Sequence, residues 1–294
     1  MAARLNLDAL PAPALILGGI ASVQFGAAFA DTLFAEAGPA GVVLLRLMLS
    51  AAALLALTRP RLAGRSRREL LTAAGFGAAL AGMNWTFYEA LHRLPLGPAV
   101  TVEFAGPLAL AIAGSRRLID LLWAALAGGG VALLAFGASS GSGKLDPVGL
   151  LLALLAGTFW AGYILLSQRV GSVFSGLQGL ALALSVGAVL VLPAGLIQGG
   201  TALLRPHVLF GGLCVALLSS LIPYSLELTA LRRIAASTFG LLMSLEPAFA
   251  ALAGVLVLGQ RLRPTTALAL VMVVIASIGT TLRASRAEPP PPLG

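Results

Sequence analysis

Runs of about 20 apolar residues recur from one end of this 294-residue chain to the other, and they limit its fold more than any other feature. A run of that length crosses a hydrocarbon layer about 30 Å thick. Inside lipid the backbone N–H and C=O groups must bond to one another, so a spanning run is a helix or a strand of a closed barrel. Barrel strands alternate apolar and polar residues, and this chain lacks that alternation. We therefore expect an all-α membrane protein.

Composition agrees with that expectation and argues against a nucleic-acid partner. Hydrophobic residues make up 59% of the chain and charged residues only 10%, whereas soluble domains have about 25% charged residues. The formal net charge of +8 would suit a nucleic-acid binder if the basic residues shared one wetted face. Here they stand between apolar runs, so we expect the lipid bilayer, and no nucleic acid, as the partner. The single Cys214 lies within an apolar run and has no second cysteine to pair with.

The apolar runs predict ten transmembrane helices with short connections, which would form an antiparallel bundle. The proline-rich segment 284–294 cannot continue a helix and is predicted to be a disordered tail. The ten predicted spans are 13–34, 39–58, 70–91, 96–114, 119–138, 147–168, 177–197, 207–231, 238–258 and 265–282.

The distribution of Lys and Arg predicts the orientation. With ten spans, thirteen basic residues fall on the side of the two termini and five on the opposite side, and Arg46 lies within a span. Because cytoplasmic loops are richer in Lys and Arg, both termini are predicted to be cytoplasmic. The AFA before Asp31 resembles a signal-peptide cleavage site, but segment 21–29 has a counterpart at 156–164, which favours an uncleaved first span. The five basic residues of the opposite side are Arg93, Lys144, Arg205, Arg261 and Arg263.

An internal repeat predicts that the two halves are inserted in opposite directions. The stretch ALHRLPLGPAVTVEFAGPLALAIAG (90–114) aligns without gaps on ALRRIAASTFGLLMSLEPAFAALAG (230–254) and places Pro107 on Pro247. The two copies are five spans apart, and an odd offset turns the second copy upside down in the membrane. Inverted repeats with a site near the bilayer midplane are common in transporters. The predicted units are a first five-helix repeat at 13–138 and a second at 147–283.

Ionisable residues near span centres mark the candidate site. Glu103 stands four residues before Pro107, Glu246 stands directly before Pro247, and Arg46 lies near the middle of its own span. A charged side chain at that depth costs about 2.5–3.5 kcal/mol, so it faces the bundle interior or a wet cavity. Proline has no N–H to donate, so each acid-bearing helix is predicted to open beside its acid. Freed backbone groups at this depth are tolerated only against protein or a cavity.

Two interpretations of these residues remain open. In one, Arg46 and Glu103 form a structural ion pair and the prolines only bend their helices. In the other, which we favour, Arg46 receives an anionic group and a glutamate receives a cation or a proton. Further polar and aromatic candidates also have simpler explanations: interhelical hydrogen bonds, packing, or, for the glutamate near a span end, a wetted boundary. These candidates are Gln24, Asn84, Tyr88, Trp160, Tyr163, Tyr224 and Glu227.

The sequence gives little support for an enzyme. There is no HExxH motif, no cluster of Cys and His residues, and no P-loop for ATP hydrolysis. No aspartate stands near a span centre, so the paired carboxylates of a membrane aspartyl protease are missing. We expect no metal and no cofactor, and any transport would be secondary. A passive channel or facilitator for small metabolites remains an alternative.

Three stretches resemble the drug/metabolite transporter superfamily with two EamA domains, and within it the bacterial inner-membrane threonine/homoserine exporters: NWTFYEALHRLPLGPAVTVEFAGP, SLIPYSLELTAL and TFGLLMSLEPAFAALAGVLVLG. The resemblance implies ten helices in two inverted repeats and export of small amino acids or related metabolites in exchange for protons. It also implies a central cavity that involves Asn84, Tyr88, Glu103, Tyr224 and Glu246. The chain departs from the family at Gln260, because many EamA domains have Gly-Glu where this chain has Gly-Gln.

Overall fold

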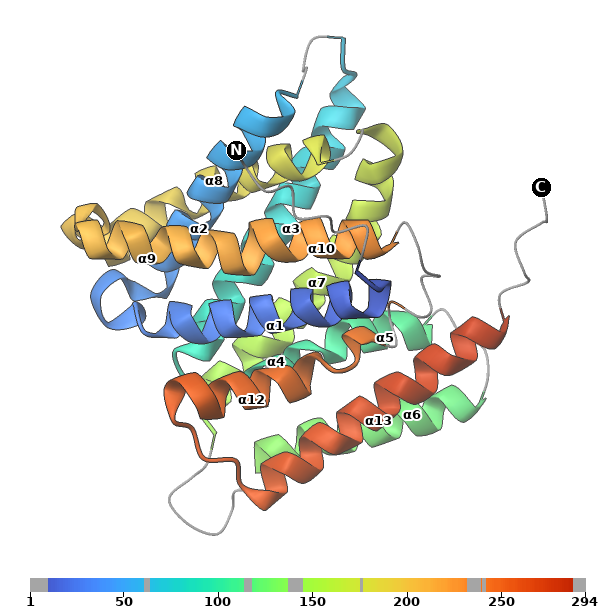
Figure 1. The fold of residues 1–294 in the computed structure, drawn as a ribbon. Helices are drawn as coiled ribbons and strands as arrows, with labels where there is room; N and C mark the ends of the chain where they lie inside the picture. The colour runs from blue at the N-terminus through green and yellow to red at the C-terminus, as the bar shows by residue number, and fades with distance from the viewer. Residues whose placement is uncertain are drawn as a thin grey trace.

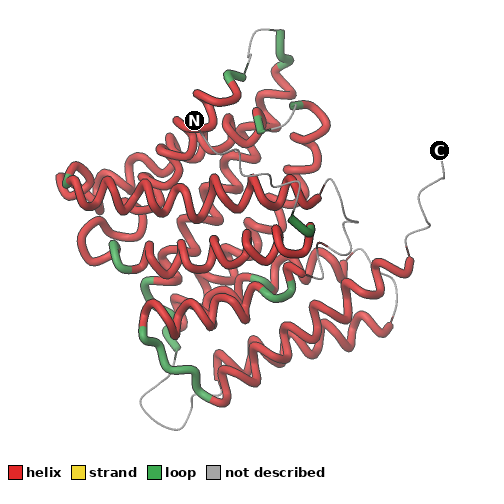
Figure 2. Tube along the Cα trace, viewed as in Figure 1, coloured by secondary structure: helices red, strands yellow, loops and turns green. Residues whose placement is uncertain are grey.

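The computed structural model describes residues 10–60, 64–113, 118–136, 145–174, 177–231, 239 and 242–287, and the regular elements in these ranges are all helical (Figure 2). The α-helices are α1 (Ala12–Asp31), α2 (Phe34–Thr58), α3 (Arg67–Leu91), α4 (Leu96–Glu103), α5 (Ala105–Ala113), α6 (Leu118–Phe136), α7 (Pro147–Val173), α8 (Gln178–Gly199), α9 (Pro206–Ala216), α10 (Ile222–Leu231), α12 (Glu246–Leu258) and α13 (Pro264–Ala287). A 3₁₀ turn (η2, Gly200–Leu204) follows α8, and a π-helical segment (η3, Leu217–Leu221) joins α9 to α10.

Five stretches of the described chain are long and apolar enough to cross a membrane: α1, α2, α7, Gln178–Leu204 and Pro206–Glu227. The other apolar helical stretches are shorter, and α3 is long but more polar, since it carries residues such as Asn84 and Glu89. Many large aliphatic side chains point outward, for example Ile197 and Leu256, as expected of a surface that lies in lipid. The chain is therefore a helical membrane protein.

The start of several helices is set by local hydrogen bonds. Ser66 and Glu69 form a capping box at α3, in which the Glu69 carboxylate accepts the Ser66 N–H at 2.7 Å and Ser66 Oγ accepts the Glu69 N–H. At α7, the Asp146 carboxylate accepts the N–H of Val148 at 2.9 Å, and Pro147 occupies the first helical position. These caps place the beginnings of two of the helices that carry cavity residues.

The predicted opening beside each acid is confirmed, and it is more complete than a kink. The predicted span 96–114 is two helices, because α4 ends at Glu103 and α5 begins at Ala105. In the second half, a turn at Ser244 and Leu245 precedes α12, whose first residue is Glu246. Much of the predicted stretch before this turn, residues 232–238, 240 and 241, lies outside the described residues.

Two other predicted spans differ from the structure. The span predicted at 39–58 is preceded by a short helical stretch that begins at Phe34, and non-helical backbone at Gly38, with φ of 66°, turns the chain between this stretch and the helix that starts at Pro39. The span predicted as continuous at 207–231 contains the π-helical segment Leu217–Leu221. A π segment carries an extra residue per turn and often marks a functional site.

Most helix pairs in the bundle join a segment of the first half to one of the second (Figure 1). Helix α2 packs on α8, α6 on α13, and α4 on α12, while α3 packs on α7 and α1 on α10. The beginning of α1 and the end of α13 lie at the same end of the bundle (Figure 1). The connections from α3 to α4 and from α12 to α13 lie at the opposite end of the bundle (Figure 1).

Candidate functional site

A cavity of about 120 Å³ lies among α1, α2, α3, α4, α7, the π segment, α10 and α12. All of the site residues predicted from the sequence line it, except Tyr88 and the two prolines. Pro107 and Pro247 lie in the first turns of α5 and α12. The predicted residues that line the cavity are Gln24, Arg46, Asn84, Glu103, Trp160, Tyr163, Tyr224, Glu227 and Glu246. Residues far apart in the sequence are thus brought to one place.

Arg46 of α2 is held by neutral groups. Its Nε donates to Ser220 Oγ at 3.2 Å, its Nη1 to the Tyr88 hydroxyl at 3.2 Å, and its Nη2 to the Ser219 carbonyl at 2.7 Å. The structural interpretation of Arg46 and Glu103 is wrong, because no ion pair joins these two side chains, both of which the structure describes. The guanidinium prefers the closer hydroxyl and carbonyl partners and keeps its charge unpaired.

Tyr88 lies outside the cavity and contacts Arg46. Its side chain is fully buried and its ring lies 5.7 Å from the guanidinium carbon of Arg46, while the rings of Phe34 and Phe87 pack on it at 5.5 and 6.0 Å. The resemblance implied that Tyr88 takes part in the cavity, but its side chain does not line it. Instead, the Tyr88 hydroxyl orients Arg46 by accepting a hydrogen bond from its guanidinium. Ser220 has the same function on the other side of the guanidinium.

The π segment that supplies Ser219 and Ser220 is tied to α1. Ser22 Oγ donates to the Leu218 carbonyl at 2.6 Å, and a Cβ at Gly26 would overlap Ser219 Oγ. The glycine therefore permits the close approach of α1 to this segment. Sequence reasoning missed both serines, although the pair Ser219-Ser220 is an unusual polar interruption of an apolar stretch.

Three carboxylates face the cavity: Glu103 at the end of α4, Glu227 on α10 and Glu246 at the beginning of α12. Glu103 and Glu246 are only 7% and 5% exposed, and none of the three has an ion-pair partner among the described residues. Glu227, for which a wetted boundary position was the alternative, lines the cavity together with the other two acids. Gly19 of α1 lies beside Glu227: a Cβ there would be in ordinary van der Waals contact with Glu227 Cγ, at 3.5 Å.

Two buried polar atoms in the cavity wall have no hydrogen-bond partner in the described structure: Gln24 Oε1 and Ser219 Oγ. A buried polar group without a partner is costly, so such groups are normally bonded to protein, water or ligand. Asn84 differs, since its Nδ2 donates to the Leu80 carbonyl at 2.8 Å within α3. The cavity therefore offers one cation, three carboxylates and two unused neutral groups.

Helix α7 crosses the α4–α5 break at very short distance. A Cβ at Gly157 would overlap the Glu103 carbonyl, and a Cβ at Gly106 would overlap the carbonyl of Gly157. The Glu103 carbonyl is the one that Pro107 cannot satisfy, so the freed group is covered by α7. One turn further along α7, the Trp160 ring meets Phe104 edge-on with 5.7 Å between centroids, while it also lines the cavity.

Several apolar residues that line the cavity were missed by sequence reasoning. They follow the helical spacing of the polar ones, because Ala27 is three residues after Gln24 and Phe87 three after Asn84. Applying that spacing to each predicted polar residue would have found some of them. The missed apolar residues are Val23, Ala27, Met83, Phe87 and Met243.

Comparisons with known proteins agree with this site. Residues 147–282 match the EamA-like transporter family. The threonine/homoserine exporter RhtA of Escherichia coli (strain K12) is 42% identical over 269 residues, which cover 91% of this chain and 90% of that protein. The RhtA of Salmonella typhimurium (strain SL1344) is 41% identical over 273 residues, 92% of each chain.

A solved crystal structure also shares the fold. The structural alignment covers 94% of this chain and 99% of the other chain, with a TM-score of 0.63. At 19% sequence identity, this establishes similarity of fold alone. The close relatives carry the family assignment, since they extend over nine-tenths of the chain. On this basis the chain belongs to the EamA-like transporter family of the drug/metabolite transporter superfamily and is similar to its threonine/homoserine exporters.

Proposed function

We propose that this protein exports small amino acids of the threonine or homoserine type, or closely related metabolites, in exchange for protons and by alternating access to the central cavity. The observation that carries the proposal is the cavity itself, in which one unpaired guanidinium faces three carboxylates and two unused neutral groups. A zwitterion with a small polar side chain has the complementary groups. The names of the similar exporters support the substrate class.

Arg46 is the proposed receptor for the substrate carboxylate. A guanidinium has five N–H donors. Arg46 uses Nε and one hydrogen on each terminal nitrogen for Ser220, Tyr88 and Ser219, which leaves one hydrogen on Nη1 and one on Nη2. Two N–H groups on neighbouring nitrogens fit the two oxygens of a carboxylate. The same contacts hold the guanidinium in place, so little side-chain entropy is lost on binding.

The carboxylates of Glu103, Glu227 and Glu246 are proposed to receive the substrate ammonium and the exchanged proton. Three like charges around one small cavity, with a single guanidinium, are costly to keep ionised together. An entering ammonium would compensate one of these charges and release a proton, which couples the two fluxes. Gln24 Oε1 and Ser219 Oγ would bond the side-chain hydroxyl of the substrate.

The size of the cavity supports a small cargo. About 120 Å³ is well below the roughly 300 Å³ at which pockets for drug-sized ligands begin. Trp160, Tyr163 and Tyr224 contribute rigid rings and hydroxyl groups to the wall. These features favour an amino acid over a bulky hydrophobic drug.

The helix pairs support two inverted repeats, one at 13–138 and one at 147–283. If the halves are exchanged, α2 corresponds to α8 and α6 to α13, and each of these helices packs on its own counterpart. The contact between α3 and α7 likewise corresponds to that between α10 and α1. A two-fold relation between the halves would produce this pattern, with ten spans in a bacterial inner membrane and both termini in the cytoplasm.

Alternating access is proposed to use the two helix breaks. Glu103 and Glu246 stand at the breaks of α4 and α12, and these two helices pack on each other. A helix interrupted at mid-depth can tilt one half without moving the other. Rocking of the two repeats about the cavity would then open it to each side in turn.

Purified protein in proteoliposomes tests the proposal. Vesicles loaded with unlabelled threonine should take up labelled threonine by counterflow, and an imposed pH gradient should drive net uptake. Glu103→Gln is expected to keep counterflow and to lose the response to the gradient, whereas Glu36→Gln, at an exposed site away from the cavity, is expected to behave like the wild type. An unchanged gradient response in Glu103→Gln would remove the proton role of that acid, and uptake without counterflow would identify a passive facilitator.

A further inference from the structure

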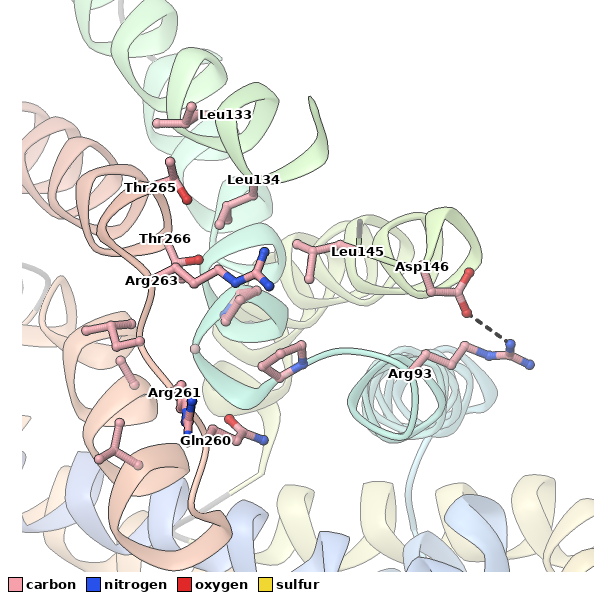
Figure 3. A pocket seen from close by; sticks show the side chains of 16 residues that line it. Arg93, Leu133, Leu134, Leu145, Asp146, Gln260, Arg261, Arg263, Thr265 and Thr266 are labelled. Carbon is pink, nitrogen blue, oxygen red and sulfur yellow. Dashed lines mark hydrogen bonds and ion pairs between the residues drawn. The ribbon is translucent and has the colours of Figure 1, made fainter. Parts of the chain in front are cut away.

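A second cavity, of about 280 Å³, lies at one end of the bundle and apart from the central one (Figure 3). It is bounded by the beginnings of α4, α7 and α13 and by the ends of α6 and α12. Figure 3 shows Arg261 and Arg263 on the connection between α12 and α13, with Arg93 across the cavity. None of these residues takes part in the transport site described above.

The charges of this end cavity are not balanced. The Arg93 guanidinium pairs with the Asp146 carboxylate at 3.2 Å. Arg261 and Arg263 have no ion-pair or hydrogen-bond partner for their guanidinium groups in the described part of the chain. The cavity is therefore lined by two arginines without an acidic partner and a third that is paired with a carboxylate, and it is suited to an anion.

The grouping of these arginines is unexpected from their distribution along the chain. They stand on the side that the positive-inside rule predicts to be outside, where basic residues are few. Of the five residues predicted there, Arg93, Arg261 and Arg263 line this one cavity, Lys144 lies outside the described residues, and Arg205 pairs with Glu36 elsewhere. Three arginines at one cavity, on the side of the membrane where basic residues are otherwise few, indicate a binding function for that cavity.

Gln260 also lines the end cavity and adds no charge to it. Its Oε1 accepts the N–H of Leu96 at 3.0 Å, which fastens the α12–α13 connection to the beginning of α4. A glutamate could accept the same hydrogen bond and would add a negative charge beside Arg261 and Arg263. Gln260 thus holds the connection in place without placing a negative charge beside the two arginines.

The rest of the wall is apolar. Leu133 and Leu134 of α6, Val255 of α12 and Leu262 line it. Thr265 and Thr266 add two hydroxyls at the beginning of α13 (Figure 3). A cavity at the helix ends lies at the depth of the lipid headgroups. Guanidinium groups bind phosphate well, and the neighbouring leucines offer a path for the first carbons of acyl chains.

We propose that the end cavity is a binding site for the headgroup of an anionic phospholipid. The phosphate would lie between Arg261 and Arg263, the Thr265 and Thr266 hydroxyls would be within reach of the headgroup, and the acyl chains would leave along α6 and α12. Lipid bound there would hold the α12–α13 connection against the beginning of α4 and so stabilise the folded bundle. The site is independent of the transport chemistry and can be tested without it.

Delipidated protein in a neutral detergent provides the test, with thermal stability and retained lipid as the two measurements. Phosphatidylglycerol should raise the melting temperature and be retained in native mass spectra, whereas phosphatidylcholine and free glycerol phosphate should do neither. The effect should weaken at high salt. Each arginine removed, in Arg261→Gln and Arg263→Gln, should weaken binding roughly fivefold, and about 25-fold together.

Two further variants make the test specific. Gln260→Glu keeps all the arginines and the acceptor for Leu96 but adds a carboxylate, so it should also weaken phosphatidylglycerol binding. Arg205→Gln removes a basic residue from the same end of the bundle, outside the end cavity, and should bind as the wild type does.

Three outcomes would overturn the proposal: an equal response to phosphatidylcholine, an equal response to free glycerol phosphate, or an equal loss in Arg205→Gln. The lipid comparison on wild-type protein decides the matter even if a variant does not fold. Because no step measures transport, failure here would leave the proposed export function untouched.

Discussion

Replacing Gly157 should show how closely α7 is fitted to the break beside Glu103. A Cβ at this position would overlap the Glu103 carbonyl, which is backbone and cannot move aside as a flexible side chain could. Overpacking of a well-packed interior costs about 1–3 kcal/mol, and alanine recovers roughly 0.5–1 kcal/mol of this through its better helix propensity. Gly157→Ala should therefore destabilise the protein, and Gly157→Val should do so more strongly.

Gly162 is the matched control, because it lies on the same helix and a Cβ there would meet nothing within 4 Å. Gly162→Ala should be neutral or slightly stabilising. At roughly 2–4 °C for each kcal/mol, the melting temperatures of Gly157→Val and Gly162→Ala should differ by several degrees in a thermal unfolding assay in detergent. Equal melting temperatures for the two variants would refute the close contact between α7 and the α4–α5 break.

Two further predictions concern single hydrogen bonds. Ser220→Ala should leave the Arg46 Nε without its acceptor and weaken substrate binding by about tenfold, visible as a raised KM at nearly unchanged maximal rate, whereas Ser225→Ala, on an exposed hydroxyl of α10, should not. At the beginning of α7, the Val148 N–H and then Arg93 hold the pKa of the Asp146 carboxyl below its usual value of 3.8. Its contribution to stability is present above that value and is lost as the pH falls through the lowered one. Asp146→Ala should therefore lower the melting temperature near pH 7, and the difference from the wild type should shrink as the pH falls below 3.8 and through the lowered pKa, whereas a difference that does not shrink in acid would contradict the assigned cause.

The membrane class and the charged residues of the cavity could be predicted from the sequence because lipid leaves a chain few choices. A glutamate or an arginine in the middle of an apolar run has to face inward, so Arg46, Glu103 and Glu246 were identifiable without coordinates. Pro107 and Pro247 predicted the breaks for an equally local reason, namely the missing N–H. These predictions depended on position within a single span.

The partners of these residues were not predictable in the same way. Arg46 forms hydrogen bonds with Ser219, Ser220 and Tyr88 and no ion pair with Glu103. This choice of partners depends on how α2 is rotated against the π segment, which no local sequence pattern predicts. The position of Glu227 was open for a related reason, since distance from a span end does not give the direction of a side chain in the bundle.

The end cavity illustrates the same limit. Arg93 and Arg261 stand in connections of different halves, and the sequence gives only the predicted side of the membrane for each. The packing of α4 on α12 and of α6 on α13 is what brings them together. Local chemistry thus identified the important residue types, while the packing of the two halves determined which of them meet.

The most direct measurement is the binding of labelled threonine to purified protein, with analogues as competitors. If Arg46 receives the substrate carboxylate, binding should be saturable and displaced by homoserine, but not by threoninol or threonine methyl ester, which lack a free carboxylate. Arg46→Gln should weaken it about 30-fold or more, and Arg205→Gln should leave it unchanged. Equal competition by the methyl ester, or unaltered affinity in Arg46→Gln, would contradict the assignment of the central cavity as the amino-acid site.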